Sequence, residues 1–344
     1  YPTLFRQLPA ARALPITILH AARFEAPPPH TGFHAEHHMN ISPAYSVANK
    51  VSGIIVIPAR LLSSRLPRKL LLNDTGRPLL AYTIEQAQKA VAASPGLLRE
   101  VVVACDDEQL MQVAEASGVR GVMTSDVHPN GTCRIAKAIQ EIASTDDISF
   151  VLNVQGDQPE LQPEAMLQVV IDLIEHPDCE MATAAVANRM SRLATENLFR
   201  DCSSTDPNVV KVEFDSSGHA TDFWRQSTAA NNSLLNPASD GPYGDGGICA
   251  YPVTRSVPDR EPRDHWYRHI GIYAYRIYFL QRYANTSPSP REKQESLEQL
   301  RALEMGAAIR VSLITDDQAG RAIDTSVDYS DFVDRMRQRK AAPQ

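Results

Sequence analysis

Continuous hydrophobic runs and amphipathic segments alternate along the chain from about Ser52 onward. The continuous runs, which are typical of parallel strands buried on both faces, occupy 53–58, 101–104, a short stretch near Val122, and 149–154. Segments with apolar side chains at helical spacing occupy 79–92, 108–117 and 133–143, and a further helix is expected to begin near Pro163. This alternation predicts an α/β fold in which helices cover both faces of a mostly parallel sheet.

The second half of the chain departs from this regular alternation. Strands are predicted at 181–186, 209–214, 268–275 and 309–313, and helices at 292–305 and 327–339. The long connections between the first three of these strands indicate a smaller lobe, within 180–290, that is added to the sheet. Residues 226–265 are rich in Asn, Ser, Pro, Gly and Asp, so we expect a flexible insertion there.

Residues 1–50 stand apart from the predicted domain, which spans 51–340. They mix Pro, Ala and His without a clear period, and this pattern predicts a disordered or leader extension. Two interpretations of the extension stay open. The first 24 residues contain three arginines and no acidic residue, as in an organelle transit peptide, whereas Met39 would be a reasonable alternative start.

Composition restricts the class of partner. The 344-residue chain has a formal net charge of −7 with acidic and basic residues interleaved, unlike the basic surface that a nucleic-acid polymer requires. Its five cysteines are widely separated and form no CxxC pair, which favours a reducing compartment such as the cytoplasm. No apolar run reaches the roughly 18 residues of a membrane span. We therefore expect a soluble, cytoplasmic protein that acts on a small molecule.

Positively charged residues cluster in the loop that follows the first predicted strand. The loop contains Arg60, Arg65, Arg68 and Lys69, together with Ser63. Ligands of open α/β sheets bind at the carboxyl ends of the strands, so these side chains are placed to hold phosphates. Forked Arg donors and a compact Lys charge suit a triphosphate, although the glycines of a Walker A loop are missing. The simpler alternative is a solvated basic loop.

Two aspartates are candidates for a magnesium site. Asp157 follows Gly156 in a tight turn after the strand at 149–154, and Asp324 follows the strand at 309–313. Magnesium commonly takes one or two carboxylates plus phosphate oxygens, so these two residues would suffice beside a triphosphate. Each aspartate alone has a simpler interpretation as a turn residue or helix cap. Their joint meaning depends on whether they meet in space, which their spacing in the sequence does not establish.

Around these residues the sequence resembles a known family, the 3-deoxy-manno-octulosonate (Kdo) cytidylyltransferases, also called CMP-Kdo synthetases. The matching segments are IPARLLSSRLPRK (57–69), GRPLL (76–80), VVVACDD (101–107), NGTCR (130–134), VLNVQGDQP (151–159), PNVVKV (207–212), RHIGIYAYR (268–276), ESLEQLRALE (295–304) and AIDT (322–325). They follow the family's order over nearly all of 53–335. This collinearity is more specific than any single motif.

The resemblance implies a fold, a reaction and a set of roles. The fold would be a Rossmann-like nucleotidyltransferase, usually a homodimer, and the reaction would couple CTP to Kdo for lipopolysaccharide biosynthesis, releasing pyrophosphate with the help of Mg²⁺. By position, the nucleotide would be held by Arg60, Ser63, Arg65, Lys69, Arg134 and the backbone around Ala104 and Asp106. Catalytic roles would fall to Arg65, Lys69 and Asp157, and the metal ligands would be Asp157 and Asp324. The sugar site would comprise Gln155, Arg225, His269, Tyr273, Glu295 and Glu298, with Arg225 pairing the sugar carboxylate.

The sequence departs from the family at a few positions. Gln158 stands where the family usually has Glu, which would weaken magnesium binding if that Glu helps to hold the ion. Family members usually carry an acid at the position of Cys133 and Gly at that of Arg68, and the insertion at 226–265 is longer than expected. Two alternatives therefore stay open: a cytidylyltransferase for sialic acid, and a non-catalytic nucleotide-binding module, which the Gln158 substitution would favour. Retention of both Asp157 and Asp324, together with Lys69, argues against the second alternative.

Overall fold

The computed structural model describes residues 51–125, 130–142, 147–187, 209–225 and 266–341. The predictions for 1–50 and for the insertion at 226–265 lie outside the described residues. The described strands are β1 (Gly53–Ala59), β2 (Leu98–Cys105), β3 (Arg120–Met123), β4 (Phe150–Val154), β5 (Met181–Ala187), β6 (Lys211–Phe214), β7 (Ala220–Trp224), β8 (Tyr267–Arg276) and β9 (Ile309–Ile314).

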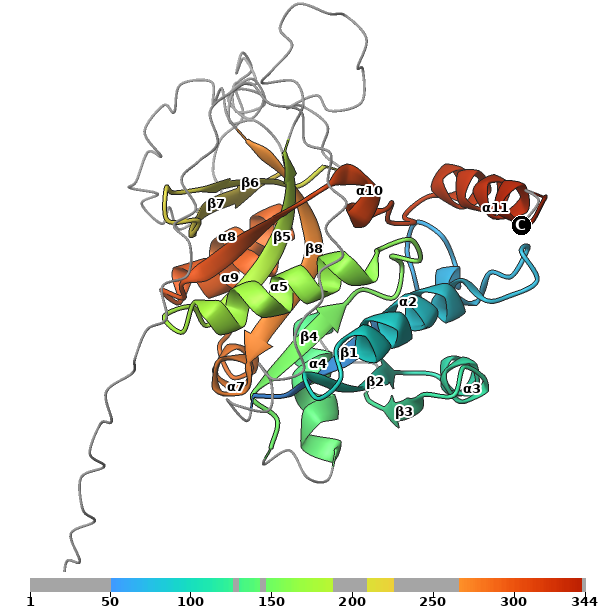
Figure 1. Ribbon diagram of the computed structural model, residues 1–344, viewed down its shortest axis with the longest axis horizontal. Helices are drawn as coiled ribbons and strands as arrows, with labels where there is room; N and C mark the ends of the chain where they lie inside the picture. Colours follow the sequence, from blue (N-terminus) through green and yellow to red (C-terminus); the bar gives the residue numbers. More distant parts are fainter. Residues whose placement is uncertain (1–50, 126–129, 143–146, 188–208, 226–265, 342–344) are drawn as a thin grey trace, which may run out of the picture. The chain divides into compact units, whose positions relative to one another are not determined.

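One sheet contains these strands, in the order β3-β2-β1-β4-β8-β5-β9, with β6 and β7 attached beside β8 (Figure 1). Neighbouring strands along this order are parallel except at β8, which runs antiparallel to both β4 and β5. The prediction of an α/β fold with a mostly parallel sheet is therefore confirmed.

Helices cover both faces of the sheet. The described helices are α2 (Leu79–Ala93), α3 (Glu108–Ala116), α4 (Gly131–Glu141), α5 (Pro163–Glu175), α7 (Ile277–Ala284), α8 (Pro290–Glu295), α9 (Gln299–Glu304), α10 (Asp316–Ala319) and α11 (Ser326–Ala341), together with the 3₁₀ helix η1 (Lys69–Leu71). Buried side chains of α2, α3 and α5 form one core with one face of the sheet, and those of α4, α7 and α9 form a second core with the other face. Figure 1 shows α2 and α5 lying across the same side of the sheet.

Burial on both faces explains the continuous apolar runs. All seven residues of β1 are buried, with Ile55 and Ile57 in the first core and Ile54 and Val56 in the second. Successive side chains of a strand point to opposite faces, so a strand between two helical layers has no polar side. The run at 53–58 is therefore a central strand, as predicted, and its carboxyl end opens toward the basic loop.

Several predicted elements differ from the structure. The single helix predicted at 292–305 is two helices, α8 and α9, because Ser296 adopts a left-handed conformation with φ 54°. Helix α4 begins two residues earlier than predicted, since the Asn130 side chain caps it by accepting from the Cys133 N–H at 2.8 Å. Strand β7 and helix α7 were not predicted.

The region from 180 to 290 contributes to the main sheet. Strands β5 and β8 are inner strands of that sheet, while the β6–β7 hairpin pairs with β8. Two of the three strands on which the added lobe was predicted are therefore part of the main sheet, and a role of this region in sugar binding or dimerisation stays a prediction. Within the described residues, no helix is long and apolar enough to cross a membrane.

Candidate functional site

Three residues that the sequence predicts to share a ligand meet at the carboxyl edge of the sheet. The Lys69 ammonium nitrogen Nζ lies 2.6 Å from Asp157 Oδ2 and 3.2 Å from Asp324 Oδ1. Lys69 comes from η1, Asp157 from the loop after β4, and Asp324 from the segment before α11. The guanidinium of Arg65 lies 3.0 Å from the same oxygen of Asp324. These four side chains therefore form one charged cluster.

Backbone contacts between two loops bring the aspartates together. The Ile323 N–H donates to the Asp157 carbonyl at 2.9 Å, which places Asp324 beside Asp157. Gly320 packs against the same loop at φ 59°, and a Cβ at this position would lie 2.6 Å from backbone atoms of Glu160. Glycine is therefore required, because both the conformation and the close approach exclude a side chain.

Helix α11 holds the Asp324 segment from its other side. The buried carboxylate of Glu160 accepts from Arg335 at 2.6 Å and from Arg339 at 3.1 Å, both on α11. The Tyr329 hydroxyl donates to Asp74 Oδ2 at 2.9 Å, in the segment that follows η1. An apolar cluster joins α11 to α2 and comprises Leu79, Ile323, Tyr329, Phe332, Val333 and Met336. The last helix thus links the basic loop, the Asp157 loop and Asp324.

The paired aspartates have the chemistry that magnesium needs. Their side chains are 27% (Asp157) and 39% (Asp324) exposed, so both can reach a ligand in solvent. Magnesium prefers oxygen ligands and usually combines one or two carboxylates with phosphate oxygens. Because both carboxylates already share one ammonium group, they are close enough to act on one cation. The donor set therefore fits the predicted ion.

The other cations of the loop have different surroundings. Arg65 is exposed and points to Asp324, whereas Arg60 and Ser63 are half-buried. Arg68 has a left-handed backbone, with φ 53°, and its guanidinium donates to Gln109 of α3. A glycine would adopt this backbone without steric cost, which gives a physical reason for the glycine expected here from the family resemblance. The fourth cation is thus held toward α3.

Arg134 has a different place from the one predicted for it. Its guanidinium is fully buried and donates to Asp106 Oδ2 at 2.9 Å and to Thr124 Oγ1 at 2.7 Å. The other oxygen of Asp106 accepts from the Leu61 N–H at 2.9 Å, and Ala104 is fully buried within β2. As the side chains lie in the structure, Arg134 does not face a ligand directly. It fixes Asp106, and Asp106 in turn fixes the start of the basic loop.

A pocket of about 460 Å³ opens beside the aspartates. Both Asp157 and Asp324 line it. Five of the six residues predicted for the sugar site also line it, namely Gln155, Arg225, His269, Tyr273 and Glu298. Glu295, the sixth, is not among the lining residues; it ends α8 just before the break at Ser296, and that break separates it from Glu298. The volume is in the range of small-molecule sites.

His269 is neutral in this pocket. Its Nε2 lies 2.8 Å from Thr183 Oγ1, and that hydroxyl donates its proton to the Ile272 carbonyl at 2.8 Å. The ring therefore donates from Nε2, because the Thr183 oxygen can only accept. Burial, reinforced by the positive charge of Arg225, lowers the pKa of His269 to about 3. His269 can thus exchange hydrogen bonds with a ligand without adding charge.

Glu298 places a carboxyl group in the pocket from the start of α9. Its Oε2 accepts from Thr132 Oγ1 at 3.0 Å, and the same threonine oxygen is 3.1 Å from the Tyr275 hydroxyl. Burial raises the pKa of Glu298 above its usual value, and the bond from Thr132 opposes this rise. Tyr273 lies nearby and donates to Gln299 at 3.3 Å. A strand of aromatic residues and a helix terminus therefore meet at this side of the pocket.

Sequence reasoning missed several residues around this site. Asn130 and Gln299 line the pocket, and Thr132 and Arg301 hold Glu298 and its helix. Asn130 carries a helix N-cap signal in the sequence, whereas the other three have none, because their roles depend on tertiary contacts. Gln158, the departure from the family, is buried, and its Oε1 has no hydrogen-bond partner among the described residues.

The sheet, the basic loop after β1 and the two aspartates beside a small-molecule pocket define a nucleotidyltransferase of Rossmann-like fold. The comparisons with known proteins identify the family. A sequence model described as "Cytidylyltransferase" matches residues 54–309. The chain belongs to this cytidylyltransferase family.

Relatives of known name give a consistent result. The 3-deoxy-manno-octulosonate cytidylyltransferase of Nitrosococcus oceani is 37% identical over 293 residues, covering 83% of this chain and 95% of that protein. The enzyme of the same name from Idiomarina loihiensis is 36% identical over 287 residues, covering 83% and 98%. Among solved structures, CMP:2-keto-3-deoxy-manno-octonic acid synthetase in complex with CTP is similar with a TM-score of 0.63 and 27% identity, covering 84% of this chain and 99% of that one.

Proposed function

We propose that this chain transfers CMP from CTP to Kdo, giving CMP-Kdo and pyrophosphate. The observation that carries the proposal is the contact of Lys69 with both Asp157 and Asp324 beside a pocket of small-molecule size. Relatives that are 35–37% identical over more than four-fifths of the chain bear the name of this enzyme. The related solved structure was determined with CTP.

The charged cluster supports binding of the triphosphate. Arg65 and Lys69 supply cations next to the carboxylates, and such groups neutralise phosphate oxygens. Asp157 and Asp324 would hold Mg²⁺. The bound ion would screen phosphate charge and favour the charge that develops during transfer. In this proposal Lys69 moves its contacts from the aspartates to phosphate oxygens when the nucleotide binds.

The pocket supports binding of an acidic, hydroxyl-rich sugar. Arg225 supplies a guanidinium that can pair the sugar carboxylate through two hydrogen bonds. The neutral ring of His269 and the carboxyl group of Glu298 supply hydrogen-bond partners for hydroxyls. Gln158 Oε1 has no hydrogen-bond partner within the described ranges, and a sugar hydroxyl would satisfy it.

The reaction exchanges one phosphorus–oxygen bond for another. The anomeric hydroxyl of the sugar bonds to the α-phosphorus of CTP and its proton passes to water, while the bond between the α-phosphorus and the bridging oxygen breaks. Pyrophosphate leaves with the electron pair of that bond. Lys69 and Arg65 would stabilise the growing negative charge on the leaving group electrostatically, which is the main task of the protein in such transfers.

Purified protein incubated with CTP and Mg²⁺ tests the proposal, with pyrophosphate as the readout. Release that requires Kdo is expected. Release with sialic acid but not with Kdo would refute the proposed acceptor, and no release with either sugar would refute the enzymatic function. The homodimer implied by the family resemblance is a separate prediction, and light scattering of the purified protein would test it.

A further inference from the structure

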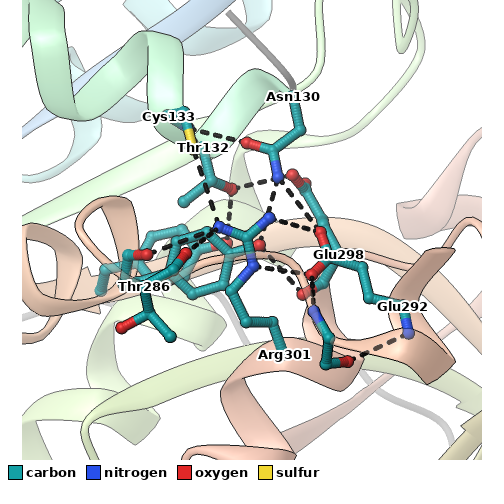
Figure 2. A network of polar contacts seen from close by, with 10 residues as sticks. Asn130, Thr132, Cys133, Thr286, Glu292, Glu298 and Arg301 are labelled. Atoms are coloured by element: carbon teal, nitrogen blue, oxygen red, sulfur yellow. Dashed lines mark hydrogen bonds and ion pairs between the residues drawn. The ribbon is translucent and has the colours of Figure 1, made fainter.

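One buried cation joins the short helices that carry Glu298. The Arg301 guanidinium, on α9, donates to Glu292, on α8, through two bonds: Nε to Oε2 at 2.6 Å and Nη2 to Oε1 at 2.5 Å. Both side chains are almost completely buried, at 2% and 9% exposure. Arg301 also donates to the Thr286 carbonyl at 2.9 Å, in the turn before α8 (Figure 2). The ion pair therefore ties the two helices and the preceding turn together.

This pair lies across the break that positions Glu298. Helix α8 ends at Ser296, where the backbone adopts a left-handed conformation. The φ of 54° at this residue is unfavourable for any residue with a side chain. Such a conformation persists only when the surrounding contacts determine it. The bidentate bond between Arg301 and Glu292 spans the break, as does the backbone bond from the Leu297 N–H to the Glu292 carbonyl at 3.3 Å, and both contribute to this determination. Glu298 lies between the break and Arg301, so its direction into the pocket depends on this bond.

The same pair contacts the residue that caps α4. Asn130, which caps α4, donates to the Tyr283 hydroxyl at 3.3 Å and lies 3.5 Å from Glu292 Oε1. The Tyr283 hydroxyl donates to the Glu298 carbonyl at 3.0 Å, and its ring lies 4.4 Å beneath the Arg301 guanidinium. Figure 2 shows Asn130 directed at this network from α4. The α4 cap and the α9 terminus are therefore held in one polar network.

We propose that Glu292 and Arg301 are positioning residues for the acceptor sugar, and that they act by fixing the Glu298 carboxyl group relative to α4. Neither residue lines the pocket, so they act through Glu298 and Asn130 rather than by contact with the substrate. This inference rests on the proposed function, because it assigns the sugar side of the same site. If these two residues position Glu298, their loss should raise the KM for Kdo and leave the KM for CTP nearly unchanged.

A paired substitution removes the bond without burying an unpaired charge. Replacing both partners of a buried ion pair with apolar residues of similar volume often leaves stability unchanged, whereas removing one partner is strongly destabilising. The test variant is therefore Arg301→Met combined with Glu292→Met. The control is Arg276→Met, since Arg276 also donates to backbone carbonyls, of Cys179 and Leu173, but stands outside the pocket.

Steady-state kinetics with Kdo and CTP varied separately give the decisive readout, after a thermal melt has established that each variant is folded. In the paired variant we expect the KM for Kdo to rise about 10-fold or more and the KM for CTP to stay within about 2-fold, since misplacement of a binding group by about 1 Å has effects of this size. The control should keep both KM values. CTP binding measured calorimetrically without sugar should be unchanged.

Two results would overturn the positioning role: an unchanged KM for Kdo in the folded paired variant, or equal increases in both KM values. If the paired variant does not fold, Arg301→Lys is the variant to test, because it keeps the charge and loses the forked donors. An unchanged KM for Kdo in the Arg301→Lys variant would refute the positioning role in the same way. Wild-type protein that releases no pyrophosphate with Kdo would instead refute the proposed function, and this failure is visible before any variant is made.

Discussion

Replacement of Lys69 with methionine separates two effects that depend on one ammonium group. The side chain is about one-tenth exposed, and its Nζ lies 2.6 Å from Asp157 and 3.2 Å from Asp324. Methionine keeps much of the length of the buried stem and removes the charge. Without that charge, the two carboxylates face each other with no shared cation, and a bound triphosphate loses a positive partner.

Loss of the Lys69 charge should strengthen metal binding and weaken catalysis. At 4 Å a unit charge contributes about 4 kcal/mol per pair when the effective dielectric constant is 20, and solvent at the partly exposed aspartates reduces this to about 1–2 kcal/mol. Loss of Lys69 should therefore tighten the binding of a divalent ion to the nucleotide-free protein by about 10-fold. Turnover should fall about 100-fold or more, the usual result of deleting one electrostatic stabiliser of the transition state.

Manganese titration monitored by electron paramagnetic resonance measures the first effect, and pyrophosphate release measures the second. Lys89→Met is a matched control, because Lys89 is exposed and pairs with Glu85 along α2. It should leave both quantities unchanged. Normal turnover in the Lys69 variant, or metal binding that weakens rather than tightens, would refute the reasoning that Lys69 shares the carboxylates with the metal.

Three further outcomes follow from individual residues. Gly320→Ala should lower stability by about 2 kcal/mol or more and abolish most activity, because its Cβ would collide with the Glu160 backbone at a positive φ; a urea melt that matches wild type would contradict this close approach. His269 has a folded-state pKa of about 3, below the 6.5 of an unfolded chain, so the unfolded state takes up the proton more readily. The stability that neutral His269 contributes is therefore present above pH 6.5 and lost as pH falls toward 3, at up to about 1.4 kcal/mol per pH unit. In the His269→Gln variant the free energy of unfolding should depend less on pH over this range. Arg68→Gly should raise the free energy of unfolding by up to about 1 kcal/mol by relieving a φ of 53°, with a lower urea midpoint as the contrary result.

The sequence predicts the sheet well because its central strands are buried on both faces. Runs such as those of β1 and β4 have no polar side, and this property is visible without any tertiary information. The break between α8 and α9 is not visible in the sequence, since good helix formers such as Glu, Lys, Gln and Leu stand on both sides of Ser296 and neither Gly nor Pro marks the break. Tertiary contacts hold that break, among them those of Arg301 with Glu292 and of Tyr283 with Glu298.

The site is predictable in its residue types and less so in its geometry. Lys69 and Asp157 follow strand ends, and such positions converge in parallel sheets. Asp324 joins them through a backbone bond from Ile323, which the spacing of residues does not encode. Arg134 has the charge expected of a nucleotide ligand, and its full burial against Asp106 is a tertiary property.

The central claim is that Asp157 and Asp324 serve one metal-bound nucleotide, and a double-mutant cycle tests it most directly. Asp157→Asn, Asp324→Asn and the double variant would be compared by kcat/KM for CTP in Kdo-dependent pyrophosphate release. The effects of mutating residues that act as one unit are not additive. Each single variant should therefore lose about 100-fold or more in kcat/KM, and the double variant should lose no more than about 10-fold beyond the worse single variant. Two losses that multiply, or near-normal activity in either single variant, would contradict a shared ion.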